Sequence, residues 1–443
     1  MKKLILLTII SLGVFIACND DKLSGDGSSK VKIARMEIKD AAALFIAPAN
    51  FSQSGSTRAA SYETNVLFEI TKDGVIKRVS YLDELGNEIN QSLVPTEVLT
   101  IDDSQYFFVR FNDGTTYMVQ ENSGAIYETP WIPFITREQR INAVGLQNYI
   151  NDDNIKIDGN GNIYYLDGYT IYKIDISEVN KITKESLTPE SDDVNMFMVS
   201  NTGHLFYRYY RDGYRSRLRN TSGRLFPFST DDDGYYMPAR ESIAFKGFDG
   251  NIHILDRRAL YAIIFNNDGS YETKDILWDN CMDQSFGHGS THFCLSNTVY
   301  ELVRECYLIK LRDRYLLINS NGLAMVVDSK YDSSILELAA HDVTGGMKIT
   351  QLEYNDSYIF CCGNKGNDFS LLRINPYTYE SEPLVHDNDY EIYSFTVLND
   401  NTITFNGLRL SDGKIILATI DGNGKVSVIK ETGNTKVTLH RVQ

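Results

Sequence analysis

The chain has 443 residues, with 59 Asp and Glu against 43 Lys and Arg, which gives a formal net charge of −16. This charge favours solubility and argues against a general nucleic-acid binder, which needs a basic surface. The length exceeds that of a usual single domain, although a closed repeat fold can use it as one unit. Tyr and Phe are plentiful, at 28 and 21, and long helical patterns are scarce, so the composition favours β-strands.

The first residues have the organisation of an export signal. Met1-Lys2-Lys3 precedes an apolar run from Leu4 to Ala17, which is too short for an ordinary membrane span and suits a signal-peptide core. The run ends in Phe15-Ile16-Ala17-Cys18, which resembles the lipobox of bacterial lipoproteins, although Leu is usual where Phe15 stands. The resemblance implies that Cys18 becomes the lipidated first residue of the mature chain. Cleavage by a general signal peptidase is the alternative.

A short acidic and Gly/Ser-rich stretch follows Cys18. Asn19-Asp20-Asp21-Lys22 comes first, and the stretch to Ser29 has the composition of a flexible tether. Acidic residues just after the lipidated Cys resemble the surface-export signal of Bacteroidetes lipoproteins. We therefore expect a signal peptide at 1–17, a tether at 18–30 and a single domain at 31–443. The resemblance implies an outer-membrane lipoprotein that faces the cell exterior, with the membrane as a partner.

A Gly-containing hairpin recurs about every 50 residues along the chain, and Ile70–Ile76 is its first copy. Its glycines are Gly74, Gly124, Gly223, Gly269, Gly322 and Gly424. Two of the intervals are nearly double steps, which predict further outer turns without Gly near Glu178 and Tyr377. Such a period is typical of radial β-repeat proteins.

A second hairpin supports the same period. Asp158–Tyr164 has counterparts in Asn201–Phe206 and Asp249–His253, and Asp or Asn before Gly supplies the positive φ angles of tight turns. These segments resemble the hairpins of NHL-type, SMP-30-like and two-component-regulator propellers. Many unrelated functions share that repeat, so the resemblance implies a fold and no activity.

The repeats predict an all-β propeller of four-stranded antiparallel blades. In one repeat the expected strands are Ile155–Ile157, Ile163–Leu166, Thr170–Ile176 and Lys181–Glu185. The expected blades are 31–82, 96–130, 150–187, 194–228, 242–277, 290–330, 348–386 and 391–431. Eight blades are preferred and seven are the alternative, in which the N-terminal strands complete the last blade or pack beside it.

The cysteines do not form a readable disulfide framework. Five remain after Cys18, namely Cys281, Cys294, Cys306, Cys361 and Cys362. The adjacent Cys361 and Cys362 lie in an expected strand, so their side chains should point to opposite faces as small buried hydrophobes. A bridge among the first three is a sharper alternative, and the spacing does not support a zinc site.

Candidate ligand-binding residues lie in the expected connections between blades, where repeat scaffolds carry function. Trp131 could stack on a sugar ring if exposed, or pack between blades if buried. Tyr235 and Tyr236 follow three acids, Asp231–Asp233, and could flank a ligand. For those acids a solvated turn is favoured over calcium, because the other oxygen ligands are not visible. Asp158, Asn160 and Asn162 have calcium-loop spacing, but Tyr169 stands where the loop needs Glu, so a hairpin is expected.

Two further segments carry polar side chains. His288 and His292 share a loop, but no third metal ligand is identifiable, and no metal or cofactor is predicted. The segment 207–219 is basic and aromatic, with Tyr214 and Arg215 at its turn. Its arginines either face solvent on an outer strand pair or bind an anionic ligand, such as an acidic polysaccharide or a protein's acidic surface. We expect Arg208 and Tyr210 to share a face with Arg215, Arg217 and Arg219.

No catalytic signature appears. The chain lacks a G-x-S-x-G elbow, a P-loop and a Rossmann fingerprint, and nothing selects a glycosidase carboxylate pair from 59 acids. The sequence therefore favours a surface-anchored, ligand-binding or scaffold propeller. Its expected partners are a polysaccharide or an outer-membrane protein, and no nucleic acid. The alternative is an extracellular hydrolase or lyase that acts on carbohydrate.

Overall fold

The computed structural model describes seven stretches of the chain. They are residues 33–52, 64–129, 155–188, 193–220, 243–275, 306–331 and 341–442, with short gaps at 39, 90–92, 101–104, 168, 176–182, 212–214, 256–260, 267, 269, 367, 386–388 and 400–401. The chain divides into two units, residues 1–32 and 33–443, and every described residue belongs to the second. Within these stretches no helix has the length and apolarity needed to cross a bilayer.

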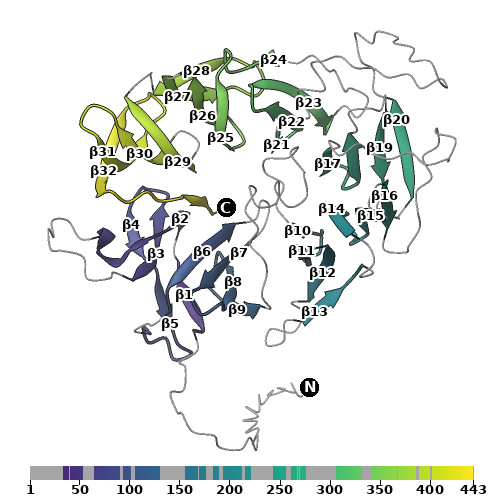
Figure 1. Ribbon diagram of the computed structural model, residues 1–443, viewed down its shortest axis with the longest axis horizontal. Helices are drawn as coiled ribbons and strands as arrows, with labels where there is room; N and C mark the ends of the chain where they lie inside the picture. The colour runs from purple at the N-terminus through teal and green to yellow at the C-terminus, as the bar shows by residue number, and fades with distance from the viewer. Residues whose placement is uncertain are drawn as a thin grey trace, which may run out of the picture. The chain divides into compact units, whose positions relative to one another are not determined.

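Six antiparallel sheets each consist of four consecutive strands (Figure 1). The first is β6 (Pro95–Thr100), β7 (Tyr106–Phe111), β8 (Thr116–Gln120) and β9 (Ile126–Thr129). The second is β10 (Ile155–Ile157), β11 (Ile163–Asp167), β12 (Thr170–Asp175) and β13 (Thr183–Ser186). The third is β17 (Ile243–Lys246), β18 (Ile252–Leu255), β19 (Tyr261–Phe265) and β20 (Tyr271–Asp275).

The other three sheets of this form follow later in the chain. They are β21 (Cys306–Lys310), β22 (Arg314–Asn319), β23 (Leu323–Ser329) and β24 (His341–Asp342); β25 (Lys348–Tyr354), β26 (Ile359–Lys365), β27 (Asp368–Ile374) and β28 (Ser381–Val385); and β29 (Tyr390–Asn399), β30 (Thr402–Arg409), β31 (Lys414–Ile420) and β32 (Val426–Gly433). Each is a meander of the kind that forms a propeller blade, so the predicted all-β propeller with four-stranded antiparallel blades is confirmed.

The remaining sheets have a different composition. One is built from β33 (His440–Arg441), β2 (Ala41–Pro48), β3 (Asn65–Thr71) and β4 (Ile76–Arg78), in that order. Another has three strands, β14 (Asp193–Val199), β15 (Leu205–Arg211) and β16 (Arg215–Asn220). A two-stranded sheet pairs β1 (Arg35–Glu37) with β5 (Ser80–Leu82), and a 3-10 turn, η1 (Ala49–Ser52), follows β2.

The predicted number of blades, eight or seven, is wrong: six blades have four strands that are consecutive in the described chain. The difference arises in two sheets that are not built from four consecutive strands. The first repeat supplies only β2, β3 and β4 to its sheet, and the C-terminal β33 provides the innermost strand. The sheet of β14, β15 and β16 shows no fourth strand among the residues described.

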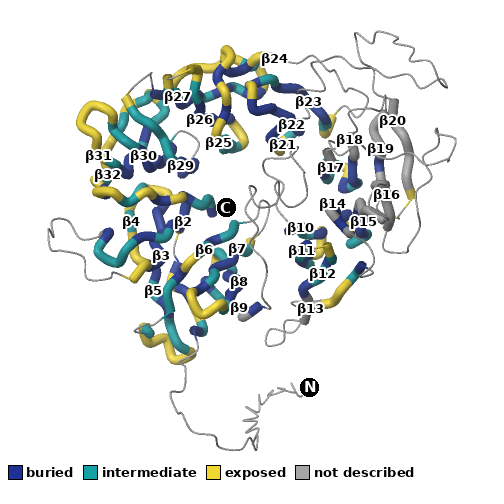
Figure 2. The backbone as a smooth tube through the Cα atoms, in the orientation of Figure 1, coloured by how far each residue is buried: buried dark blue, intermediate teal, exposed yellow. Residues whose placement is uncertain are grey.

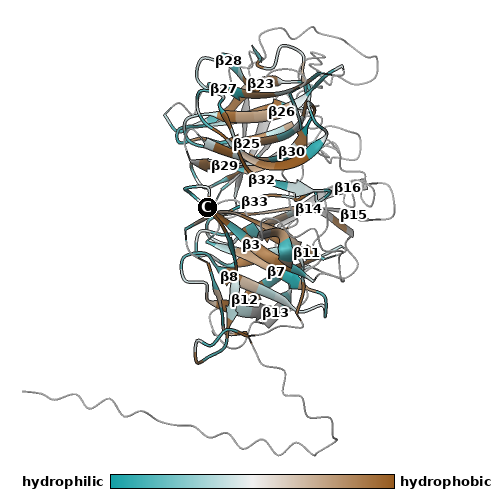
Figure 3. Cartoon of the chain, turned by 90° about the vertical axis from the view of Figure 1, so that its left-hand side faces the viewer, coloured by the Kyte–Doolittle hydropathy of each residue, from teal (hydrophilic) through white to brown (hydrophobic). Residues whose placement is uncertain are grey.

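Apolar side chains bury the faces between successive sheets. One core joins the β25–β28 and β29–β32 sheets, and includes Phe360, Cys362, Phe395 and Phe405. The central strands β22 and β30 are buried along most of their length, as the dark blue tube in Figure 2 shows. Figure 3 shows the matching hydrophobic colour on β26. Burial of a Phe or Leu side chain contributes about 1.5–3 kcal/mol, so these interfaces are the main stabilising element.

The β33 strand ties the two ends of the propeller together. Ala43 and Leu44 of β2 pair with Arg441 and His440. Leu439 packs with Phe45 and Leu417 in the core between the first and last repeats. The Arg441 guanidinium also donates a hydrogen bond to the Tyr354 carbonyl oxygen at the end of β25.

A recurring side-chain contact forms the hairpins. Asp158 Oδ1 accepts hydrogen bonds from the backbone amides of Asn160 and Asn162, at 2.8 and 2.9 Å. The third residue after Asp158, Gly161, has φ +82°. Asx turns of this kind favour Gly at the left-handed position. The same pattern recurs from Asp83, Asn319 and Asp421.

The predicted sixth blade is displaced. The expected range was 290–330, whereas the sheet spans Cys306–Asp342. The expectation that Gly322 lies in an outer turn is wrong, because Gly322 lies between the two middle strands, β22 and β23, where Asn319 closes the turn. The turn predicted near Tyr377 is confirmed, because it connects β27 and β28.

Candidate functional site

Most of the predicted ligand-binding residues lie outside the described part of the chain. These are Trp131, Tyr214, Tyr235, Tyr236 and His288, as well as the lipidation candidate Cys18 and the paired His292. Arg215 is described through its backbone, as the first residue of β16. Their proposed roles therefore stay predictions.

The strand register corrects the expected grouping in the basic segment. Residue pairs in register share a face of an antiparallel sheet. The pairs are Arg211 with Arg215, Tyr209 with Arg217, and Tyr207 with Arg219. The arginines of β16 are thus in register with the odd-numbered residues of β15, and the expectation that they join Arg208 is wrong.

Asp158 is a structural residue of its hairpin. Besides the two amides, its carboxylate accepts from Asn162 Nδ2 at 2.8 Å and from the Tyr164 hydroxyl at 3.2 Å. A carboxylate that already accepts four hydrogen bonds has little capacity left for a cation. The hairpin interpretation is confirmed over the calcium loop.

The adjacent cysteines point to opposite faces, as predicted. Cys361 packs between the β21–β24 and β25–β28 sheets, and Cys362 packs between the β25–β28 and β29–β32 sheets. Both are free thiols, and burial raises the pKa of Cys361 and raises that of Cys362 to about 11. Cys306 is buried too, while Cys281 and Cys294 lie outside the described residues, so a bridge among these three stays a prediction.

An exposed surface at the junction of two sheets combines aromatic and cationic side chains. We call it the Asp313 surface, and its members are Arg312, Asp313, Arg314, Lys330, Tyr331 and Tyr377. Arg312 and Asp313 lie in the β21–β22 turn, and Arg314 is the first residue of β22. Lys330 and Tyr331 follow β23, and Tyr377 lies in the β27–β28 turn. The β27–β28 turn of one sheet thus contacts the β21–β22 turn of the neighbouring sheet.

Asp313 is the centre of this surface. Its Oδ1 accepts a hydrogen bond from the Tyr377 hydroxyl at 3.2 Å and one from Arg314 Nε at 3.4 Å. Its carbonyl oxygen accepts from the Lys330 amide at 2.9 Å. The Arg314 guanidinium lies over the Tyr377 ring, 4.5 Å from its centroid, in a cation–π contact. Four members of the surface are therefore fixed relative to one another.

The β27–β28 turn holds Tyr377 in place. Asn375 Oδ1 accepts hydrogen bonds from the amides of Tyr377 and Thr378, at 2.9 and 3.2 Å. Two residues further on, Tyr379 has φ +63°, which is unusual for a bulky residue. Its ring stacks on His341 of β24, with centroids 4.1 Å apart and an interplanar angle of 13°. This contact attaches the turn to the neighbouring sheet.

The electrostatics keep both tyrosines protonated. Desolvation raises the pKa of Tyr377, and the Asp313 carboxylate raises it further. Desolvation also raises the pKa of Tyr379, and nearby Arg314 acts in the opposite direction. The Tyr377 hydroxyl therefore remains a hydrogen-bond donor to Asp313.

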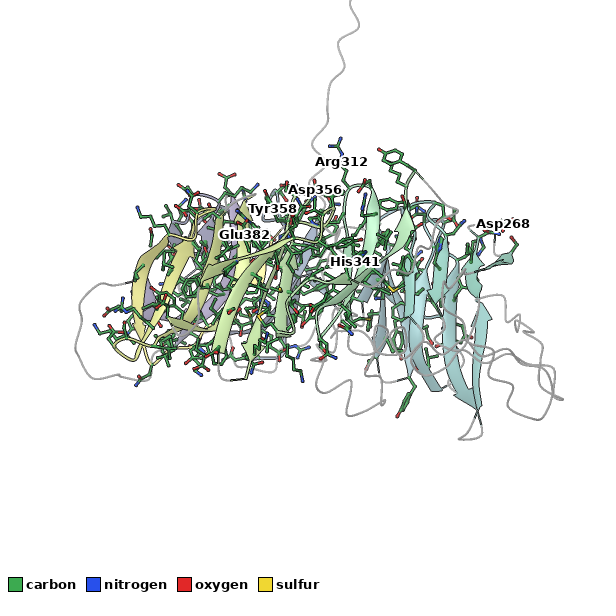
Figure 4. All side chains as sticks on the ribbon, turned by 90° about the horizontal axis from the view of Figure 1, so that it is seen from above. Asp268, Arg312, His341, Asp356, Tyr358 and Glu382 are labelled. Carbon is green, nitrogen blue, oxygen red and sulfur yellow. The ribbon has the colours of Figure 1, made fainter. Side chains whose placement is uncertain are left out.

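The surface is open to solvent. Tyr331 is 80 % exposed and Tyr377 is 41 % exposed, and each is among the large exposed hydrophobic side chains of the described residues. Figure 4 shows Arg312 at the edge of the ribbon, with Asp356, Tyr358 and Glu382 along the same edge. Arg373 donates to Glu382 at 2.7 Å and lies 4.8 Å over the Tyr358 ring.

Sequence reasoning missed this surface. The only local signals were the charged turn Arg312-Asp313-Arg314 and the turn Asn375-Pro376-Tyr377-Thr378-Tyr379. Nothing in either segment shows that the two meet, because the contact crosses from one sheet to the next. Among the described residues, no group of three or more His, Cys, Asp or Glu side chains could hold a metal ion.

Comparisons with known proteins concern the fold. No family model and no curated protein matches the chain. Among solved structures, AztD from Citrobacter koseri has 13 % identity and a TM-score of 0.45, over 93 % of this chain and 99 % of that one. Dihydro-heme d1 dehydrogenase NirN in complex with DHE has 10 % identity and a TM-score of 0.37, over 78 % and 74 %.

A virginiamycin B lyase from Staphylococcus aureus has 12 % identity and a TM-score of 0.32, over 64 % of this chain and 88 % of that one. All three are β-propeller proteins. At such identities and TM-scores these likenesses carry no argument about this chain, and none of the three activities transfers to it.

Proposed function

We propose that this protein is a ligand-binding propeller that the lipid on Cys18 anchors in the outer membrane, facing the cell exterior. Its ligand is a polysaccharide. We infer that the protein is a Bacteroidetes-type surface lipoprotein. This inference rests on the lipobox-like Phe15–Cys18 and on the acidic stretch that follows.

The observation that supports polysaccharide binding is the orientation of Tyr377. Arg314 and Asp313 hold this ring while 41 % of the residue faces solvent. An aromatic ring that is already ordered loses little conformational entropy when it stacks on the apolar face of a sugar. Tyr331, which is 80 % exposed and directly follows Lys330, offers a second ring for another sugar unit.

The test uses residues 31–443, without the anchor, on a panel of immobilised polysaccharides. Tyr377→Ala should weaken retention about ten-fold, which corresponds to the loss of a central aromatic contact. Tyr169→Ala is the matched control, since Tyr169 is 51 % exposed on another hairpin and should not matter. Equal retention of both variants would contradict the assigned site. Trp131→Ala tests the second candidate in the same format.

The panel also separates binding from catalysis. Release of reducing ends or unsaturated products by the wild type would favour the alternative, a hydrolase or lyase that acts on carbohydrate. For the anchor, Cys18→Ala should move the protein out of the membrane fraction. Shaving of intact cells with protease should remove the wild-type domain, and protection from the protease would contradict surface exposure.

A further inference from the structure

We propose that the Asp313 surface selects a polysaccharide that carries carboxylates, such as a uronate polymer, over a neutral one. This inference rests on the proposed function, since it names the ligand class of the same site. It depends on two cationic residues, Arg312 and Lys330, whose backbones lie next to Asp313.

Both cations are available for a ligand. Arg312 and Lys330 are exposed, and neither side chain forms a hydrogen bond or an ion pair with another described residue. Three other arginines, Arg110, Arg373 and Arg409, each have a carboxylate partner, at 2.7, 2.5 and 2.5 Å. In a chain of net charge −16, an arginine without an acidic partner has an unused binding capacity.

The acid at the centre of the surface opposes an anion only weakly. The Asp313 carboxylate accepts hydrogen bonds from both Tyr377 and Arg314, and Arg314 compensates its charge. The charges of Arg312 and Lys330 then remain, and Asp356 is the exposed acid next to Tyr377. Among the described residues of this surface and Asp356, the charge balance is positive, against the sign of the whole chain.

The positions of the cations suit a pyranose acid. Arg312 directly precedes Asp313, and the Lys330 amide binds the Asp313 carbonyl oxygen, so the backbones of both cationic residues lie next to the residue that the Tyr377 hydroxyl contacts. A sugar that stacks on this ring would direct its carboxylate sideways, toward the neighbouring side chains. A guanidinium binds a carboxylate through two parallel hydrogen bonds, which gives geometric selectivity as well as charge.

The test compares polygalacturonate with its fully methyl-esterified form, which has the same backbone and no charge. The unanchored wild type should bind the acid at least five-fold more tightly than the ester at low salt. The preference should shrink in 0.5 M sodium chloride, because salt screens exposed charges. Alginate and its ester provide a second pair with a different backbone.

The variants assign the preference to this surface. Arg312→Gln should lower affinity for polygalacturonate about three- to five-fold, which is the range for an exposed ion pair, and leave the ester unchanged. Arg78→Gln is the control, because Arg78 is also exposed and has no ion pair with a described residue. Equal affinity for acid and ester, or equal effects of the two substitutions, would overturn acid selection.

The outcomes distinguish this inference from the proposed function. If wild type binds acid and ester equally and Tyr377→Ala weakens both, polysaccharide binding at Tyr377 stands and acid selection fails. If wild type binds neither polygalacturonate nor alginate, and neither of their esters, polysaccharide binding and acid selection are both overturned.

Discussion

The buried imidazole of His440 should make the stability of the propeller depend on pH. His440 lies in β33 opposite Leu44 of β2, and desolvation lowers its pKa from 6.5 to about 4. The folded protein therefore holds this side chain neutral, whereas the unfolded chain protonates it below about pH 6.5. The contribution of His440 is complete above pH 6.5 and is lost as the pH falls toward 4.

The size of this loss of stability follows from the difference between the pKa of His440 in the folded protein and in the unfolded chain. One pH unit corresponds to about 1.36 kcal/mol, so lowering the pH from 6.5 to 5.0 should remove about 2 kcal/mol. This is an upper figure, because part of the residue surface is exposed. We expect a loss of about 1–2 kcal/mol, which is a large part of a typical stability of about 5–15 kcal/mol.

Urea unfolding of residues 31–443 at pH 7.5 and pH 5.0 measures this loss. Wild type should lose about 1–2 kcal/mol more than His440→Gln, which cannot be protonated. His341→Gln is the control, because His341 is exposed on β24. Carboxylates with lowered pKa values, such as Asp249 beside His253, stay ionised at both pH values in all three proteins and do not affect the comparison. An identical pH dependence of wild type and His440→Gln would refute the reasoning.

Two further substitutions test the packing of the propeller. Leu439→Ala should lower the free energy of unfolding by about 2–4 kcal/mol, because Leu439 is 5 % exposed in the core that joins the first and last repeats. Leu410→Ala, at a position 40 % exposed, should change it by under about 0.5 kcal/mol, and equal effects would contradict the closure by β33. Gly322→Ala should cost about 2–4 kcal/mol in urea unfolding, since φ is +81° and a Cβ there would overlap Thr344 Oγ1. Gly86→Ala, with φ +82° and open space, should cost only about 1 kcal/mol; an equal cost would show that the overlap is relieved.

The sequence predicted those parts of the fold that depend on local signals. In the repeat that begins at Ile155, the expected strands agree with β10 to β13 within two residues. This accuracy arises because the Asp158 turn and the alternation of Thr170–Asp175 are both local patterns. The sixth blade was displaced because an Asx turn with Gly has the same pattern between middle strands, at Gly322, as between outer strands, at Gly424.

Features that depend on distant contacts could not be predicted. Nothing around His440 shows that it pairs with β2, and two residues form too short a strand to recognise. The Asp313 surface is similar, since Tyr377 and Asp313 are 64 residues apart and meet only because their sheets are neighbours. Near Tyr377 the sequence predicted only an outer turn, and no role in ligand binding.

The pairing of β33 with β2 has a consequence for the order of folding. Its partners, residues 43–44 and 440–441, are about 400 positions apart, so this is a contact of very high sequence separation, and such contacts form late. Until it forms, the edge of β2 has unpaired amides and carbonyls that can template a strand from another molecule. A nascent chain that stops short of β33 would therefore expose a site for domain swapping or aggregation. Synthesis of β33, rather than completion of the first repeat, would then set the moment at which the edge of β2 becomes paired.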